Sequence, residues 1–137
     1  MKKNNSPLVT LGMPIYNGDL WLDQAIQSLI DQDYPNFNIL LIDDCSSDNS
    51  WRICKKYSNK SINITIERNT KNLGAVGNFK KVLSKAVGKY FVWCSQDDFW
   101  EKNFVSELVR RMEDCSDAAI AMGRVMIHSD DHNSYEV

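Results

Sequence analysis

Short runs of apolar residues recur along the chain at intervals that suit alternating strands and helices. Five runs are rich in β-branched, aromatic or other large apolar side chains and are short enough to be buried strands. They cover residues 8–13, 39–42, 62–66, 90–93 and 118–122. We therefore predict five strands, most of them separated by enough chain for a helix.

Four other segments carry apolar side chains three or four positions apart, which is the spacing of one helix face. In chain order these positions are Leu22, Ala25, Ile26, Leu29 and Ile30; Trp51, Cys54 and Tyr57; Phe79, Val82, Leu83 and Ala86; and Val105, Leu108, Val109 and Met112. Asp19 is a candidate N-cap of the first helix, and the second should begin near residues 46–48. The third should follow Gly77-Asn78 and end before Gly88. This alternation predicts an α/β fold, a mostly parallel sheet with helices on both faces.

Length and charge narrow the classes of function. The 137 residues suit a single domain, 1–137, and 16 Lys and Arg against 18 Asp and Glu give a net charge of -2. Without a basic patch we expect no nucleic-acid partner. No run reaches the roughly 18 apolar residues of a membrane-spanning helix, which predicts a cytoplasmic protein. The four cysteines lack zinc-site spacing and are expected to be buried or incidental thiols.

Candidate chemistry gathers at the predicted strand ends. In an open α/β sheet the ligand crevice lies beyond the carboxyl ends of the strands. Those ends supply residues 14–17, Asp43-Asp44, residues 69–74 and residues 95–98, which include the second acidic pair Asp97-Asp98. Two carboxylate pairs at one edge suit Mg²⁺ or Mn²⁺, which commonly holds a diphosphate, and Tyr16 offers an aromatic face for a base. These features predict a nucleotide-diphosphate pocket.

Five motifs along the chain resemble those of a known family. They are P-I-Y-N at 14–17, D-Q-D-Y-P-N-F at 31–37, I-D-D-C-S-S-D-N-S at 42–50, N-L-G-A at 72–75 and S-Q-D-D-F-W at 95–100. Their order and spacing, across roughly residues 7–115, resemble the family 2 glycosyltransferases with the GT-A fold, a Rossmann-like nucleotide-diphospho-sugar transferase fold. The last motif is similar to that of rhamnosyltransferase-like members.

The resemblance implies a role for each matching residue. Pro14, Tyr16 and Asn17 would bind the nucleotide, and Asp44 would read the edge of the base. A further set would complete the donor site: Asn72 and Gly74 beside the nucleotide, Asp97 at the ribose and Asp98 at the metal, Mg²⁺ or Mn²⁺. Many members carry an aspartate where this chain has Ser95, which leaves Asp97 and Asp98 to serve the metal.

The resemblance also implies a reaction. Family members transfer a sugar from a nucleotide-diphosphate sugar to an acceptor hydroxyl with inversion, assisted by a metal and a carboxylate base. No residue here matches that base, so the catalytic residue is not assigned. The alternation of strand and helix patterns fades after about Arg124. We therefore expect a truncated GT-A domain that binds donor and lacks the acceptor-binding half.

The implied partners follow from the same resemblance. A UDP- or dTDP-sugar is the expected donor, and a saccharide or lipid-linked saccharide is the expected acceptor, in cell-surface polysaccharide synthesis. The expected location is cytoplasmic, at the inner face of the membrane if a missing C-terminal region associates with it.

Plainer interpretations stand beside these. Asp43-Asp44 could be a solvated strand end, although the recurrence of a pair at Asp97-Asp98 favours a pocket. Tyr16 could be a packed rim residue, and the segment from Asn72 to Gly74 could be only a turn. A polar tail is favoured over a metal site at His128, Asp130, Asp131 and His132. Two other functions stay open: a receiver-type phospho-acceptor domain, and a nucleotide-binding module that has lost catalysis.

Overall fold

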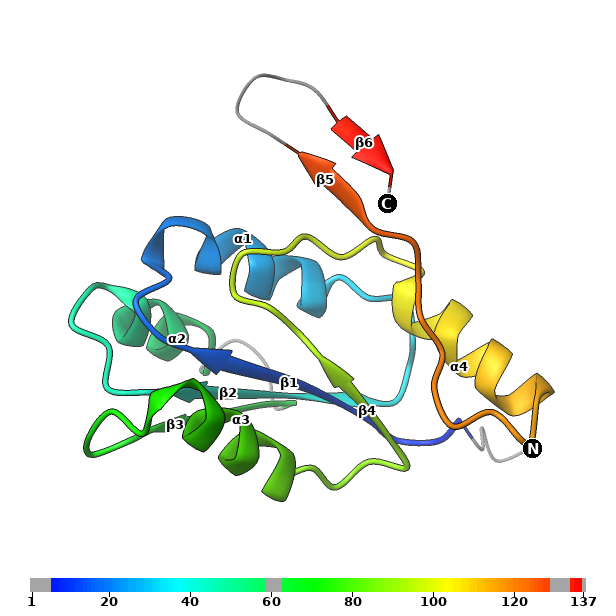
Figure 1. Cartoon of the computed structure of the whole chain (residues 1–137), viewed down its shortest axis with the longest axis horizontal. Helices are drawn as coiled ribbons and strands as arrows, with labels where there is room; N and C mark the ends of the chain where they lie inside the picture. The colour runs from blue at the N-terminus through cyan, green and yellow to red at the C-terminus, as the bar shows by residue number, and fades with distance from the viewer. Residues whose placement is uncertain (1–5, 59–62, 129–133, 137) are drawn as a thin grey trace.

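A computed structural model describes residues 6–58, 63–128 and 134–136. Strands and helices alternate through most of the chain (Figure 1). In order they are β1 (Val9–Ile15), α1 (Asp19–Ile30), β2 (Phe37–Asp43), α2 (Ser50–Ser58), β3 (Ile64–Arg68), α3 (Gly74–Ser84), β4 (Tyr90–Trp93), α4 (Phe104–Asp114), β5 (Met126–His128) and β6 (Ser134–Glu136).

The first four strands form one parallel sheet in the order β3-β2-β1-β4. β1 pairs with β2 along its whole length, from Val9 opposite Phe37 to Ile15 opposite Asp43. Its other neighbour, β4, is shorter and lies at the edge. The central strand therefore ends between two loops that come from distant parts of the sequence, and this arrangement positions the site.

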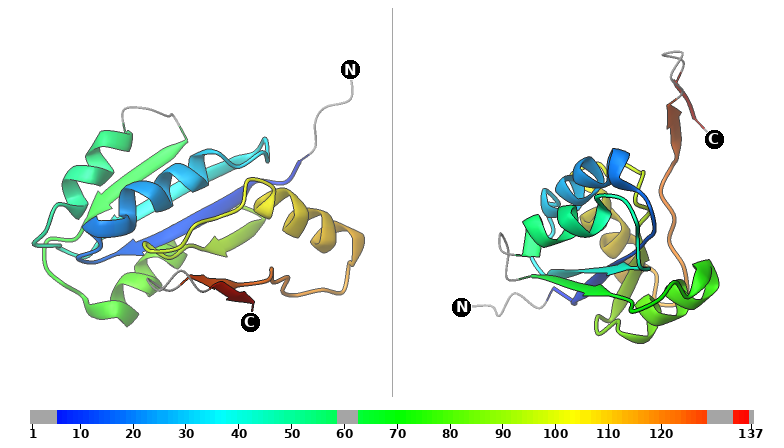
Figure 2. Two further views of the ribbon diagram at one scale, coloured as in Figure 1. Left: turned by 90° about the horizontal axis from the view of Figure 1, so that it is seen from above. Right: turned by 90° about the vertical axis from the view of Figure 1, so that its left-hand side faces the viewer.

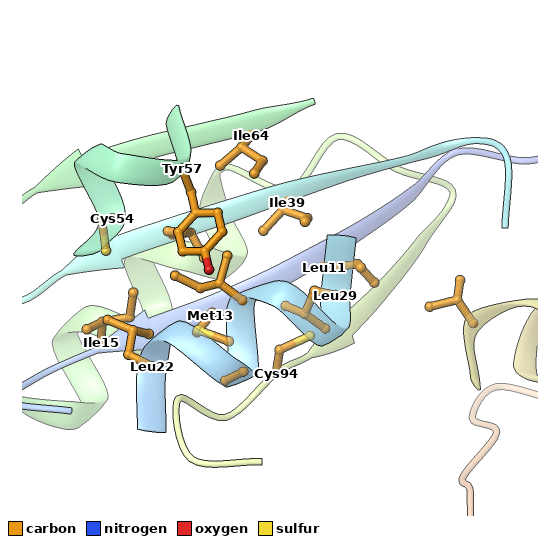
Figure 3. Packing of buried hydrophobic residues seen from close by; sticks show 14 of the residues in the cluster. Leu11, Met13, Ile15, Leu22, Leu29, Ile39, Cys54, Tyr57, Ile64 and Cys94 are labelled. Carbon is orange, nitrogen blue, oxygen red and sulfur yellow. The ribbon is translucent and has the colours of Figure 1, made fainter. Parts of the chain in front are cut away.

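Helices cover both faces of the sheet, as the sequence predicts. Figure 2 shows α1, α2 and α4 on one side and α3 on the other. On the three-helix side, Leu11, Met13 and Ile15 of β1 are completely buried against α1 and α2, and Figure 3 shows Leu22, Leu29 and Tyr57 packed over them. Alternate strand residues share a face, so this one stripe of β1 provides much of the core.

The face under α3 has a smaller core. Leu40, Ile42 and Val82 are buried there, with Phe91 packed against them. Gly12 of β1 lies beneath this cluster, and a Cβ placed on it would come within 2.6 Å of the Phe91 ring and 2.7 Å of Val82 Cγ1. The missing side chain at Gly12 is what lets α3 pack close to the centre of the sheet.

The fifth predicted strand is wrong. Residues 118–122 are irregular, and Ile120 and Met122 are 78% and 83% exposed. A strand needs a neighbour to satisfy its backbone, and apolar composition alone does not supply one. Instead β5 and β6 form a separate antiparallel pair, which stands away from the main sheet in Figure 1.

The helix ends also differ in part from the prediction. α3 begins at Gly74, before Gly77, because Asn72 Oδ1 accepts a 2.7 Å hydrogen bond from Gly74 N at the first turn. It ends at Ser84 with Lys85 as C-cap, ahead of Gly88. The N-cap of α1 is Gly18, and Asp19 is the first helical residue. Within the described residues, no helix is long and apolar enough to cross a membrane.

Candidate nucleotide-binding site

A cavity of about 560 Å³ lies at the carboxyl ends of β1, β2 and β4, beside the first turns of α3. It is lined by Pro14, Ile15, Tyr16, Asp44, Asn72, Gly74, Ala75, Asn78, Phe79, Trp93, Cys94, Ser95, Gln96, Asp97 and Asp98. Every residue to which the family resemblance gives a role in the site is in this lining except Asn17. The fold thus brings together residues from four separate segments.

The cavity opens where β1 and β4 part. Their pairing ends at Gly12 opposite Trp93, followed by a 2.9 Å hydrogen bond from Cys94 N to Gly12 O. The backbones of successive strand residues hydrogen-bond to opposite neighbouring strands, so the backbone of Pro14 faces β4, as that of Gly12 does. Proline, however, has no N–H to donate to β4. β1 continues to Ile15 beside β2. The space between the parted strands becomes the mouth of the cavity.

Asp44 forms one wall of the cavity and is 2% exposed. Its N–H donates to Ile15 O over 2.8 Å, which extends the β1–β2 pairing by one step. Its Oδ1 accepts hydrogen bonds from Asn69 Nδ2 at 2.7 Å and from Leu73 N at 2.8 Å. The carboxylate is therefore held in one orientation by the loop between β3 and α3.

Three further polar side chains support Asp44; the sequence analysis places Asn69 at this edge of the sheet, within residues 69–74, but gives none of the three a role. Asn69 Nδ2 also donates to Asn78 Oδ1 at 3.1 Å, and Lys81 Nζ donates to Asn69 Oδ1 at 2.6 Å. Asn78 Nδ2 donates to Ile42 O at the end of β2. Asn69 and Asn78 are 5% and 2% exposed. A polar residue at an otherwise apolar helix position, such as Asn78, is the available sequence signal.

Asp43 does not face the cavity, contrary to the expectation that both acidic pairs share one crevice. Its side chain is fully buried on the α2 side, where Oδ2 lies 3.0 Å from Arg68 Nε and accepts a hydrogen bond from Ser46 N. Neighbouring strand residues point to opposite faces, which separates Asp43 from Asp44. The first pair thus contributes one carboxylate to the cavity and one to an internal ion pair.

Aromatic side chains form the opposite part of the cavity. Tyr16 is 50% exposed at its mouth. Phe79 of α3 and Trp93 of β4 pack together with ring centroids 4.8 Å apart. Gln96 lies beside Tyr16: Tyr16 N donates to Gln96 Oε1 at 2.9 Å, and Gln96 Nε2 donates to Tyr16 O at 3.1 Å. The cavity therefore pairs an aromatic side with an acidic side.

Asp97 and Asp98 lie in the loop after β4 and are exposed at the cavity. Ser95 Oγ donates a hydrogen bond to Asp97 Oδ1. Partial burial of the carboxyl group raises the pKa of Asp98 above its ordinary value, and the neighbouring charge of Asp97 raises it further. Burial likewise raises the pKa of the Cys94 thiol, so Cys94 stays protonated and is a poor metal ligand.

The donor set suits a hard cation. Among the described residues, no group of three or more His, Cys, Asp or Glu side chains is placed to hold a metal. Asp97 and Asp98 instead offer carboxylate oxygens on one exposed loop. Mg²⁺ and similar ions are commonly bound by one or two carboxylates, with substrate phosphates and water completing the shell. The residues present fit such an ion.

Asn17 is the predicted site residue that lies outside the lining. It has a left-handed backbone conformation, with φ of 45°, and its Oδ1 accepts hydrogen bonds from Ser47 N and Ser47 Oγ. Asn17 N donates to Ser46 Oγ. Asn17 thus joins the loop after β1 to the loop after β2.

The same two loops join the beginnings of α1 and α2. Asp19 N donates to Asp48 Oδ2 at 3.0 Å, and Asn49 N donates to Asp19 Oδ2 at 3.2 Å. Gly18 N donates to Ser50 Oγ at 2.9 Å. Each helix therefore supplies acceptors for the free N–H groups of the other, which explains why Asp19 is not the cap of its own helix.

Comparison with known proteins agrees with this architecture. The chain matches the family described as glycosyl transferase family 2 over residues 10–137. It belongs to that family. TuaG of Bacillus subtilis, a glycosyltransferase named for teichuronic acid biosynthesis, is 28% identical over 93% of the chain. The crystal structure of residues 1–349 of TarS from S. aureus, in complex with UDP, has a TM-score of 0.71 and 27% identity over 77% of the chain.

A third comparison concerns the fold alone. The mannosyltransferase PcManGT from Pyrobaculum calidifontis, solved with GDP-Man and Mn²⁺, has a TM-score of 0.73 at 20% identity and covers 80% of the chain. The predicted GT-A fold of this family 2 glycosyltransferase chain is thus confirmed. The chain spans 50% of the length of TuaG and 32% of the TarS chain.

Family membership also excludes one of the alternative functions, the receiver-type phospho-acceptor domain. A family 2 glycosyltransferase chain is not a receiver domain, and its central strand β1 ends in Pro14-Ile15, followed by Tyr16, with no acidic pair. In the tail, His128 ends β5, whereas Asp130, Asp131 and His132 lie outside the described residues.

Proposed function

We propose that residues 1–137 form the donor-binding part of a metal-dependent, inverting glycosyltransferase. The observation that carries this proposal is the single cavity that places Tyr16, Asp44 and the Asp97-Asp98 pair around one space. An aromatic side and a fixed carboxylate correspond to the base of a nucleotide sugar, and the acidic pair corresponds to its ribose and its metal-bound diphosphate. Pro14, Asn72 and Gly74 complete the nucleotide lining, with Asn17 holding the loop behind it.

The base subsite favours a uracil or thymine ring. Asp44 Oδ1 already accepts two hydrogen bonds, so the remaining carboxylate oxygen is the acceptor for a ligand N–H. The N3–H of uracil and thymine is such a donor, as is the N1–H of guanine, whereas adenine and cytosine present an acceptor at the equivalent edge. The TarS crystal structures with UDP and with UDP-GlcNAc support a UDP-sugar, and dTDP-sugars share the same edge.

The charge of the cavity supports a metal. Its described lining contains three carboxylates, from Asp44, Asp97 and Asp98, and neither lysine nor arginine. A diphosphate brought into such a site needs a cation to offset the repulsion. When bound there, Mg²⁺ or Mn²⁺ would stabilise the negative charge of the departing nucleotide diphosphate. Asp98 would hold the ion, and Asp97 would contact the ribose.

The relatives suggest where the reaction belongs. TuaG is named for teichuronic acid biosynthesis, and TarS is named a poly(ribitol-phosphate) β-N-acetylglucosaminyltransferase. We infer a role in cell-surface polysaccharide synthesis, on the cytoplasmic side of the membrane, with a saccharide or lipid-linked saccharide as acceptor. The catalytic base and the acceptor-binding half are not assigned to any residue of this chain.

Titration calorimetry with UDP, dTDP and GDP, each with Mn²⁺ and again with a chelator, tests the proposal. We expect UDP or dTDP to bind in a metal-dependent manner. Asp98→Asn should remove the metal-dependent part of the affinity without unfolding the chain, and Tyr16→Ala should weaken binding with or without metal. Asp117→Asn, an exposed aspartate outside the cavity, is the matched control. Unchanged affinity in Asp98→Asn would overturn the metal assignment.

A further inference from the structure

The side chain of Gln96 takes the place of a missing stretch of β4. Pro14 interrupts the pairing of β1 with β4, as described above, and Tyr16 is the next residue whose backbone faces the same side. Both polar groups of the Tyr16 backbone are hydrogen-bonded to the carboxamide of Gln96. An amide side chain has the same donor and acceptor as a peptide group, so it can stand in for a strand residue.

The site is shaped to receive this carboxamide. Gly18 lies against it, and a Cβ on Gly18 would come within 2.4 Å of Gln96 Cδ and 2.5 Å of its Oε1. Gly18 has an ordinary negative φ of -116°, so its backbone does not require glycine. The close approach of the Gln96 side chain is therefore the observed reason for the absence of a side chain at Gly18.

Gln96 also adjoins the acidic pair. It precedes Asp97 in the same turn after β4 and lines the cavity between Tyr16 and the two aspartates. The backbone hydrogen bonds between β1 and the β4 segment end at Cys94 N. Beyond that point, the hydrogen bonds described between the Tyr16 loop and the Asp97-Asp98 loop are those of Gln96.

We propose that Gln96 is a positioning residue that couples the base subsite at Tyr16 to the metal subsite at Asp97-Asp98. This inference rests on the proposed donor site. A cation that orders the Asp97-Asp98 loop also orders Gln96, and Gln96 then holds Tyr16 ready for a base. Because such coupling is reciprocal, a base stacked on Tyr16 raises the affinity for the cation by the same factor.

Uridine is the probe that separates this coupling from direct metal contact. Uridine has no phosphate to bridge to a cation, so an effect of Mn²⁺ on its affinity is transmitted by the protein. We expect Mn²⁺ to tighten uridine binding to the parent chain by about fivefold, which is at the low end of typical coupling between sites. Gln96→Met keeps the length of the side chain and removes both hydrogen bonds, and the factor should fall to about one.

A second variant displaces the carboxamide without changing it. Gly18→Ala should also abolish the effect of Mn²⁺ on uridine, because the new Cβ occupies the space of Gln96 Cδ. In the double variant Gly18→Ala/Gln96→Met, the loss should be no greater than in either single variant. Gln27→Met is the matched control, since Gln27 is an exposed glutamine of α1 bonded to Asp31 outside the cavity. Circular dichroism melting curves establish that each variant is folded.

UDP distinguishes failure of this proposal from failure of the donor site. If Gln96→Met keeps the Mn²⁺ enhancement for UDP and loses it for uridine, the coupling is confirmed. Two results would overturn the coupling and leave the donor site standing, provided that UDP binds with metal dependence. In one, the affinity of the parent chain for uridine does not respond to Mn²⁺. In the other, the affinity of Gln96→Met for uridine still responds to Mn²⁺. If UDP does not bind at all, the proposed donor site is overturned, and the coupling falls with it.

Discussion

Asp44 and Asn69, which lie 25 positions apart, are joined by a 2.7 Å hydrogen bond inside the protein. Asn69 does not line the cavity, and its carboxamide is fully engaged by Asp44, Asn78 and Lys81. The carboxylate that we assign to the base is therefore oriented by a side chain that does not touch the ligand space. In the proposed donor site, recognition of the base would therefore depend on the loop after β3 as well as on β2.

Asn69→Ala should weaken both folding and UDP binding. The substitution leaves Asp44 Oδ1 with one of its two partners and deprives Asn78 Oδ1 of its donor. Leaving such buried groups unpaired costs about 1–3 kcal/mol. Urea unfolding measures the stability, and calorimetry with UDP measures the affinity. Thr70→Ala, at the exposed neighbouring position, should change neither. Full UDP affinity in folded Asn69→Ala would contradict the orienting role.

Metal-dependent nucleotide binding should weaken as the pH falls, starting above the range of an ordinary aspartate. Protons compete with the cation for Asp98, and the pKa of Asp98 is raised by partial burial and by the charge of Asp97. UDP titrations with Mn²⁺ between about pH 7 and pH 4 will give the midpoint. Asp97→Asn removes the like charge, so its midpoint should lie at lower pH. An unmoved midpoint would show that Asp98 does not control binding.

The same raised pKa has a consequence for stability. Folding favours the protonated form of Asp98, so its ionised form opposes folding at neutral pH and this cost fades as the pH falls through the folded-state pKa. Asp98→Asn should therefore melt at the same temperature as the parent chain or higher at about pH 7. The difference in melting temperature should disappear in acid. A lower melting temperature of Asp98→Asn than of the parent chain at neutral pH would show that the ionised form of Asp98 does not oppose folding.

Gly12→Ala should destabilise the fold, although Gly12 itself does not line the cavity. The added methyl group would lie 2.6 Å from the Phe91 ring and 2.7 Å from Val82 Cγ1, so α3 or β4 must shift. Overpacking of this kind typically costs about 1–3 kcal/mol. Chemical denaturation measures the loss. In the double variant, Phe91→Leu should recover part of the lost stability, since the smaller side chain relieves the contact. Failure to recover would show that the contact with Phe91 does not cause the loss.

Cys45→Gly should be neutral or stabilising. Cys45 follows Asp44 with φ of 62°, a left-handed conformation that costs a residue with a side chain about 1–2 kcal/mol and glycine almost nothing. The greater entropy of glycine in the unfolded chain offsets about 0.5–1 kcal/mol of that gain. Cys45→Ala retains the strained backbone and should show no gain. A loss of stability in Cys45→Gly alone would mean that the thiol makes a favourable contact.

The sequence predicted the parallel sheet and most of the cavity because both depend on local patterns. Apolar periodicity located α1, α4 and the four strands of the sheet, and parallel strands necessarily place their carboxyl ends together. Motif positions such as Tyr16, Asp44 and Asp98 then fall at one edge. These relationships follow from the direction of the strands and the spacing of the motifs, and both can be read from the sequence.

The remaining features depend on contacts between distant segments. The pairing of Gln96 with Tyr16 spans 80 positions, and a glutamine within an acidic motif gives no local signal of it. α3 begins at the turn from Asn72 to Gly74, which is earlier than its apolar positions indicated. The run at 118–122 had the composition of a strand, yet whether a strand forms depends on a neighbour that composition does not reveal.

The mutual pairing of the first turns of α1 and α2 leaves two negative charges at those helix ends. Burial acts to raise the pKa of Asp48, but hydrogen bonds from Ser50 and Asp19 outweigh it and hold that pKa below its ordinary value, so the carboxylate stays charged. In dinucleotide-binding folds, helix N-termini attract phosphates. Here Asp19 and Asp48 occupy those positions already. In the proposed donor site, these charges would steer an approaching diphosphate away from α1 and α2, toward a cation held at Asp97-Asp98.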